Sequence, residues 1–206
     1  MNTQKNKIVG IVCFLLLLGT VMLSLMLGSY SMTPKEVIQT ILGNGNKLQN
    51  FTIFQIRLPR IALAIIVASA LSISGGILQG ITRNPLAEPG MIGINAGAAL
   101  FVVFWISSGT TAYYSALSFS TIIWMPVVAI TGSLLSVLVI CLFAYKKGIR
   151  PVRFLLTGVG VNAGITAIIS FYQLNMSKGD YNQVLTWTNG SLWGSNWNYI
   201  LLTFPL

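Results

Sequence analysis

The sequence predicts an all-α fold, a polytopic bundle of transmembrane helices. Of its 206 residues, 54% are hydrophobic and only 7% are charged, whereas a soluble domain carries about 25% charged residues. A single core of this size could not bury so much apolar surface. In addition, the apolar residues gather in long runs separated by short polar segments, which is typical of membrane-spanning helices.

Five runs are expected to cross the roughly 30 Å hydrocarbon layer of a bilayer, and a sixth begins near the end of the chain. They lie at about 8–27, 61–82, 91–107, 122–145 and 154–174, with the start of the sixth from 199. Lys5 and Lys7 before the first run also fit a signal peptide. However, the apolar part of a signal peptide is about 7–15 residues long, so the longer run favours a span.

A short interfacial helix is expected between the first two spans. Thr33 is a suitable N-cap and Pro34 suits the first helical position. Apolar residues then recur at helical spacing at Val37, Ile38, Ile41 and Leu42. The segment "GNGNKLQN" that follows is expected to break this helix.

The distribution of basic residues predicts the orientation. Four bases fill the loop 146–153, whereas 108–121 contains none. By the positive-inside rule the basic loop is cytoplasmic. Counting spans from there places the N-terminus and 83–90 in the cytoplasm and 28–60 outside. A net charge of +9 could also indicate a nucleic-acid partner, but bases between apolar runs fit membrane topology better.

The chain offers few groups for catalysis or for binding a metal or cofactor. It has no His and only three carboxylates, Glu36, Glu88 and Asp180. Cys13 and Cys141 both fall in apolar runs, where Cys acts as a small hydrophobe. The GxxxxGK[ST] nucleotide-binding loop does not occur. We therefore expect no enzyme, no cofactor and no metal site.

Arg57 and Arg60 lie at the extracytoplasmic end of the second span, although basic residues usually gather on the cytoplasmic side. They could extend to lipid headgroups. Alternatively, they could dock an acidic partner, because the planar guanidinium binds carboxylates through two hydrogen bonds. Pro59 between them would restrict the backbone and hold the pair in a defined geometry.

The complete spans contain no charged residue, which argues against an ion-coupled secondary transporter. The polar residues at depth could join helices or line a cavity: Gln79, Asn95, Asn162, Thr166 and Gln173. Small residues form GxxxG pairs at Gly76 and Gly80 and at Gly93 and Gly97. We predict that these glycines, with Gln79 and Asn95, serve a translocation path or close helix packing.

The segment "RNPLAEPG" predicts a rigid cytoplasmic elbow. Pro85 ends the second span, because the residue before a proline disfavours helix, and Pro89 delays the next one. Arg83 suits the C-terminal end of a helix, where its charge complements the dipole. Asn84 lies between them in the turn.

The stretch 57–100, "RLPRIALAIIVASALSISGGILQGITRNPLAEPGMIGINAGAAL", resembles the signature region of the FecCD family. These proteins are permease subunits of bacterial ABC importers for ferric siderophores, haem and cobalamin. "LTGVGVN" at 156–162 and "WTNGSLWGSNW" at 187–197 are similar to later landmarks of the family.

The resemblance implies ten spans in each subunit, of which this chain would hold the N-terminal part as a single transmembrane permease domain over 1–206. It also implies a second permease subunit, cytoplasmic ATP-binding subunits and an extracytoplasmic binding protein that docks on Arg57 and Arg60. The expected function is import of a ferric siderophore or related iron chelate across the cytoplasmic membrane, with haem or cobalamin as alternative cargo.

The chain is shorter than family members, so we also expect that it is a fragment or a truncated product. Two alternatives remain open on the sequence: an inactive truncated permease, and a membrane scaffold that does not transport. A secondary transporter is a third, and it would require a coupling carboxylate elsewhere.

Overall fold

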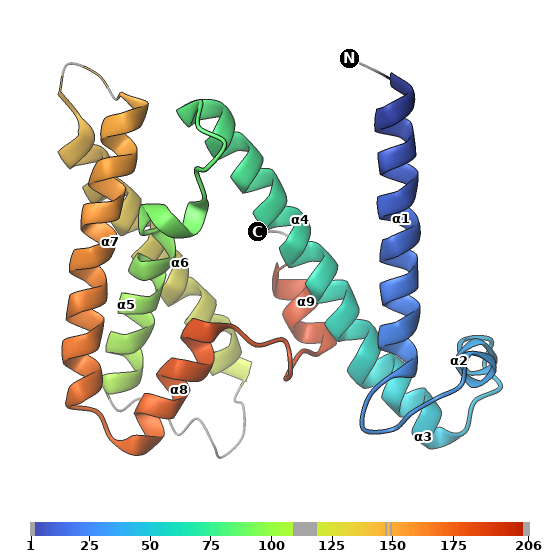
Figure 1. The fold of residues 1–206 in the computed structure, drawn as a ribbon. Coiled ribbons are helices and arrows are strands. Elements are labelled where there is room, and N and C mark those ends of the chain that lie inside the picture. The colour runs from blue at the N-terminus through green and yellow to red at the C-terminus, as the bar shows by residue number, and fades with distance from the viewer. Residues whose placement is uncertain (1–2, 109–118, 147, 149, 204–206) are drawn as a thin grey trace. The chain divides into compact units, whose positions relative to one another are not determined.

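The computed structural model describes residues 3–108, 119–146, 148 and 150–203. The described part consists of helices joined by turns and loops (Figure 1), which confirms the all-α prediction. The α-helices are α1 (Thr3–Met26), α2 (Pro34–Ile41), α3 (Lys47–Asn50), α4 (Leu58–Thr82), α5 (Ile94–Ser107), α6 (Phe119–Ala144), α7 (Pro151–Leu174), α8 (Lys178–Asn189) and α9 (Trp197–Thr203). A π-helical segment, η1 (Phe51–Arg57), joins α3 to α4, and a 3₁₀ turn, η2 (Pro89–Ile92), precedes α5.

Four helical stretches are long and apolar enough to cross a membrane: Gln4–Met26, Lys47–Thr82, Trp124–Ala144 and Pro151–Leu174. The second begins well before the expected residue 61, because Asn46 caps the start of α3 and the helix continues through η1. The segment expected at 91–107 contains α5, which has only 14 residues and a length of about 21 Å. Pro89 and the left-handed Gly93 separate η2 from α5.

The chain divides into two compact units. Unit 1 comprises residues 1–67 and 192–206, and unit 2 comprises 68–191. The boundary falls inside α4, so that this one long helix contributes its first turns to unit 1 and the rest to unit 2. A single permease domain over 1–206 stays a prediction.

Unit 1 is built around the end of α1. Leu25, Met32, Val37 and Ile53 form its buried core. As predicted, Thr33 caps α2 and Pro34 is its first residue. The Glu36 carboxylate completes the cap by accepting hydrogen bonds from the Thr33 backbone N–H at 2.7 Å and from its Oγ1 at 2.8 Å. These bonds stabilise the charged form and hold the pKa of Glu36 below its ordinary value.

In unit 2, α5 packs against α6, α7 and α8. The core residues are Ala99, Val102, Val103, Ile106, Met125, Ile169 and Val184. On the α5–α7 side, the rings of Phe104 and Tyr172 lie 4.8 Å apart between centroids. The short α8 contributes its fully buried Val184, so this otherwise polar helix belongs to the bundle and is not a free loop.

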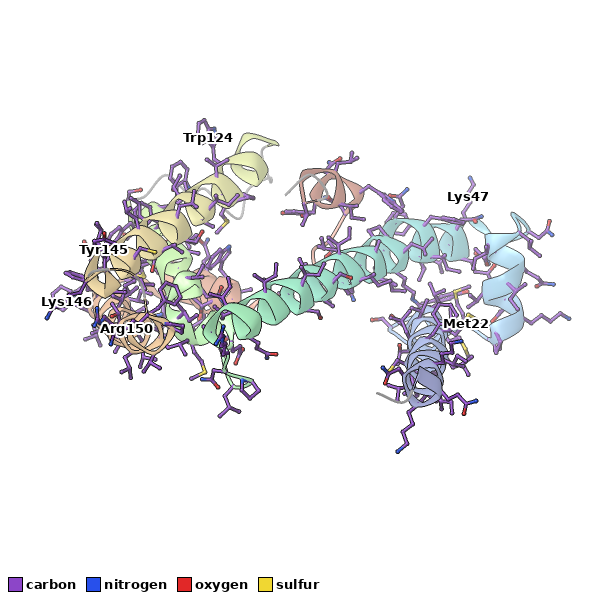
Figure 2. All side chains as sticks on the ribbon, turned by 90° about the horizontal axis from the view of Figure 1, so that it is seen from above. Met22, Lys47, Trp124, Tyr145, Lys146 and Arg150 are labelled. Atoms are coloured by element: carbon purple, nitrogen blue, oxygen red, sulfur yellow. The ribbon has the colours of Figure 1, made fainter. Side chains whose placement is uncertain are left out.

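The turn between α6 and α7 carries the basic loop. Trp124 and Tyr145 lie at opposite ends of α6, with Lys146 and Arg150 beside Tyr145 (Figure 2). Arg153 Nη1 donates to the Lys146 carbonyl at 3.3 Å across the turn. Two other predicted features fall outside the described residues, namely Lys147 of this loop and most of the 108–121 segment.

Candidate functional site

Arg57 is turned into unit 1. It is the last residue of η1, and its side chain is only 8% exposed. Its Nη1 donates to the Leu25 carbonyl at the end of α1, and its Nη2 donates to the Tyr30 carbonyl in the following loop. A Cβ at Gly28 would lie 2.9 Å from Nη2, so glycine permits the close approach. The guanidinium therefore binds one carbonyl that the end of α1 leaves without a helical partner and one carbonyl of the following loop.

Arg60 lies one turn later and is only partly buried. Its Nη2 donates to the Trp193 carbonyl at 2.8 Å, whereas its Nε is buried without a hydrogen-bond partner among the described residues. Nearby, Trp197 Nε1 donates to the Phe54 carbonyl at 2.9 Å. These two bonds join Trp193, in the segment before α9, and Trp197, the first residue of α9, to the second long helix. In the sequence, 133 residues separate Arg60 from Trp193.

The two arginines thus differ in their surroundings. Arg57 is buried and makes hydrogen bonds inside unit 1, while the Arg60 residue as a whole is only partly buried. A guanidinium has five N–H donors, and the bond to Trp193 uses one of them. Of the pair, Arg60 is better placed to meet a partner's carboxylate. The sequence gives no sign of this difference, because the carbonyls that Arg57 binds belong to residues about 30 positions earlier.

The predicted elbow is a tight turn in unit 2. Helix α4 ends at Thr82, and Arg83 follows with φ of 51° in the left-handed region. Asn84 Oδ1 then accepts from the Leu86 N–H at 3.0 Å, and the Asn84 carbonyl accepts from the Ala87 N–H at 3.1 Å. Pro85 lies inside this turn and Pro89 opens η2. Short hydrogen-bonded turns of this kind leave the backbone little freedom.

The four glycines predicted to serve packing or a path divide into two pairs. A Cβ at Gly97 would lie 2.4 Å from Ser136 Cβ and 2.6 Å from the Gly132 carbonyl oxygen of α6. A Cβ at Gly93 would lie 3.2 Å from the Asn162 backbone of α7. In contrast, a Cβ at Gly76 or Gly80 would have open space around it. The α5 glycines therefore pack helices within unit 2, and the α4 glycines face outward.

The remaining predicted polar residues are also outward or local. Gln79 and Asn95 are exposed, while Thr166 donates to the Asn162 carbonyl of its own helix at 2.8 Å. Among the described residues, no hydrogen bond joins Gln79 to Asn95. The translocation role predicted for them stays a prediction.

Sequence reasoning missed three residues of α6 and α7 that pack against η2 and α5. Helix α5 packs closely against Gly132 and Ser136 of α6, and Ser136 Oγ donates to the Gly93 carbonyl at 2.8 Å. Gly158 of α7 receives Ile92, whose atoms would lie 2.9 Å from a Cβ at that position. The spacing of Gly132 and Ser136 is a small-xxx-small pattern, so the signal was present.

Within the described residues, no cluster of three or more His, Cys, Asp or Glu could hold a metal ion.

Comparison with known proteins gives consistent matches. Residues 15–206 match the model of the FecCD transport family. The chain is 41% identical to the iron(3+)-hydroxamate import system permease protein FhuG of Bacillus subtilis, over 100% of this chain and 61% of that protein. It is 31% identical to the Fe(3+) dicitrate transport system permease protein FecD of Escherichia coli, over 93% of this chain and 56% of that protein.

A solved structure is also similar. It is an inward-facing conformation of a metal-chelate type ABC transporter, with a TM-score of 0.75 and 28% identity, covering 93% of this chain and 56% of that one. The chain thus spans somewhat more than half the length of these relatives. The family is one of transport permeases and not of enzymes, and the apolar helices make the chain a multi-pass membrane protein. On this agreement of family model, relatives and fold, the chain belongs to the FecCD transport family.

Proposed function

We propose that this chain forms part of a permease that imports a ferric siderophore or a related iron chelate across the bacterial cytoplasmic membrane. The observation that carries the proposal is the 41% identity along the whole chain to a permease named for iron(3+)-hydroxamate import. The name of the Escherichia coli relative, a Fe(3+) dicitrate permease, supports iron chelates as the cargo class. Haem and cobalamin are the alternative cargoes.

The same proposal includes three kinds of partner. Cytoplasmic ATP-binding subunits would supply the energy, a second permease subunit would complete the path, and an extracytoplasmic binding protein would deliver the chelate. The likeness to an ABC transporter structure supports such an assembly. The basic turn at Lys146 and Arg150 favours the cytoplasm for that end of α6, and a count of spans back from this turn supports a cytoplasmic N-terminus.

Within this assembly, Arg60 is the residue that would meet an acidic side chain of the binding protein. The partial exposure of this residue and its hydrogen bond to Trp193 support this role, because a positioned Arg can bind a carboxylate through two hydrogen bonds. Arg57 would act indirectly, by holding the loop after α1 against η1.

The outward face of α4 is the part of the chain that would border the path. Gly76, Gln79 and Gly80 lie on one side of the helix and are exposed. The two glycines leave the backbone uncovered, and Gln79 supplies a side-chain amide. The exposed Asn95 at the start of α5 could contribute a second amide. The elbow of Arg83, Asn84, Pro85 and Pro89 would serve as a structural turn on the cytoplasmic side.

Uptake of radiolabelled cargo tests the function, with iron as the label for the ferric chelates and haem and cobalt as the label for cobalamin. Cells that lack the gene are given a ferric hydroxamate, ferric citrate, haem or cobalamin, each in a separate arm. Loss of ferric-chelate uptake that depends on ATP, and its return with the restored gene, is the expected result. If deletion changes no arm, the chain does not transport, and a scaffolding role becomes the better explanation.

A charge reversal tests docking. Arg60→Glu is expected to weaken binding of the binding protein to the reconstituted permease, and most strongly at low salt. Lys47→Glu is the matched control, because it makes the same change of charge at an exposed position of unit 1. Equal binding by the two variants would contradict a specific role for Arg60.

A further inference from the structure

An apolar surface on α2 remains uncovered in unit 1. Val37 and Thr40 point into the unit and are fully buried. The next stripe of the helix is apolar as well, yet Ile38 is 50%, Ile41 49% and Leu42 72% exposed. These three side chains, at positions i, i+3 and i+4, form one continuous face, which we call the outer face of α2. The helix is therefore apolar on two adjoining sides, of which unit 1 covers one.

Helix α2 runs across the direction of a helix that is long enough to span a membrane. Helix α1 is apolar and long enough to cross a bilayer. Figure 1 shows α1 from the side and α2 along its axis. Figure 2 shows α1 along its axis and α2 from the side. Helix α2 therefore runs across the direction of α1. It does so at the C-terminal end of α1, where Leu23 is 52% and Leu27 is 64% exposed. Exposed apolar side chains thus continue along α1 up to the end that lies beside α2.

The charges bordering the outer face fit lipid headgroups. Lys35 precedes Leu42 by seven residues, about two helical turns, so it lies on the same stripe at the edge of the face. Lysines in this position bury their methylene stems and extend the ammonium to anionic headgroups. The acidic Glu36 is engaged in the cap with Thr33. The remaining exposed side, at Gln39, is polar and suits water.

We propose that α2 is an interfacial helix whose outer face, Ile38, Ile41 and Leu42, inserts into the lipid surface, with Lys35 at the level of anionic phosphate groups. The helix then holds the outer end of α1 at a fixed depth in the membrane. This role concerns the seating of the chain in the bilayer and does not depend on which cargo the permease carries.

Spin labels can measure the depth of α2. Cys13 and Cys141 are first replaced by alanine, and single cysteines are then introduced as Ile38→Cys, Leu42→Cys and Gln39→Cys in the full chain in lipid nanodiscs. Gln39 is the matched control, because it is exposed on the same helix but lies outside the apolar stripe. Relaxation by oxygen, which concentrates in lipid, is compared with relaxation by a water-soluble nickel chelate.

Labels at 38 and 42 are expected to respond several-fold more to oxygen than to nickel, and the label at 39 is expected to show the reverse. If the labels at 38 and 42 are as open to nickel as the label at 39, the outer face lies in water and the proposal is wrong. Protection of 38 and 42 from both reagents would also overturn it, since that result indicates a covering protein.

The lipid composition tests the part of Lys35. In nanodiscs containing phosphatidylglycerol, Lys35→Glu is expected to move the label at 42 towards water, while in phosphatidylcholine alone the same variant should change its depth less. Equal shifts in both lipids would exclude recognition of anionic headgroups. Because none of these measurements involves transport, their failure would leave the proposed function untouched.

Discussion

Replacing Gly97 by alanine should separate α5 from α6. The added methyl carbon would lie 2.4 Å from Ser136 Cβ and 2.6 Å from the Gly132 carbonyl oxygen. Ordinary van der Waals contact begins near 3.4 Å, so the helices must move apart by about 1 Å, and overpacking of this kind costs about 1–3 kcal/mol. Neither contact can yield easily, because one is backbone and the other is a Cβ atom.

Thermal unfolding in detergent measures the effect. The chain is heated in steps, and the fraction that remains monodisperse is followed by size-exclusion chromatography. For a protein of this length, about 1 kcal/mol corresponds to roughly 2–4 °C, so Gly97→Ala should lower the midpoint by about 2–12 °C. Gly80→Ala is the matched control, since a Cβ there meets nothing within 4 Å. Its midpoint should stay within a degree or two of the original, or rise because alanine favours helix.

The reasoning fails if the two variants unfold at the same temperature. It also fails if Gly80→Ala is the less stable of the two, because the close approach would then involve α4 and not α5. A third variant, Gly97→Ser, adds one oxygen atom to the same methyl position and should be no more stable than Gly97→Ala.

Three other predictions follow from single contacts. Ser136→Ala removes the bond to the Gly93 carbonyl and should cost about 1 kcal/mol in the same unfolding assay, whereas Ser133→Ala on the same helix should cost less, because its hydroxyl bonds only within its own turn. Arg57→Lys cannot reach both carbonyls in the same way, so limited proteolysis should cut more quickly between α1 and α2. The folded pKa of Glu36 is lowered. Its contribution to the α2 cap should therefore be present above the ordinary carboxyl pKa and be lost as the pH falls through the lowered value, which amide hydrogen exchange of α2 in the original chain and in Glu36→Gln would report.

The positions of most helices could be predicted from the sequence because the signals are local. Apolar length, Pro34 before α2 and the paired prolines of the elbow each act on their own few residues. The second long helix begins at Lys47, before the span expected from about 61. The segment "GNGNKLQN" contains both glycines that break a helix and, at Asn46, the cap of the next helix, so its composition alone does not show where that helix begins. The first turn of this helix, Lys47–Asn50, is polar, so the apolar pattern of the sequence does not reveal it.

The roles of individual residues were harder to predict, because they depend on atoms that are distant in the sequence. Arg57 and Arg60 are equivalent by composition and spacing, yet one binds carbonyls that precede it by 27 and 32 residues and the other binds a carbonyl 133 residues later. The same holds for the two GxxxG pairs. Each permits close packing, but the sequence does not say which pair receives a neighbouring helix.

This division of the glycines bears on how transport defects should be interpreted. Since Gly93 and Gly97 pack against α6 and α7 within unit 2, a substitution there changes the stability of the bundle, and any loss of uptake would follow from misfolding. A substitution at Gly76 or Gly80 meets open space in this chain and alters only what lies beyond α4. A variant that unfolds normally but fails to import iron chelate would therefore be expected on the Gly76–Gly80 face. Such a variant would separate a surface used for transport from one used for folding, which the loss of uptake in an α5 variant cannot do.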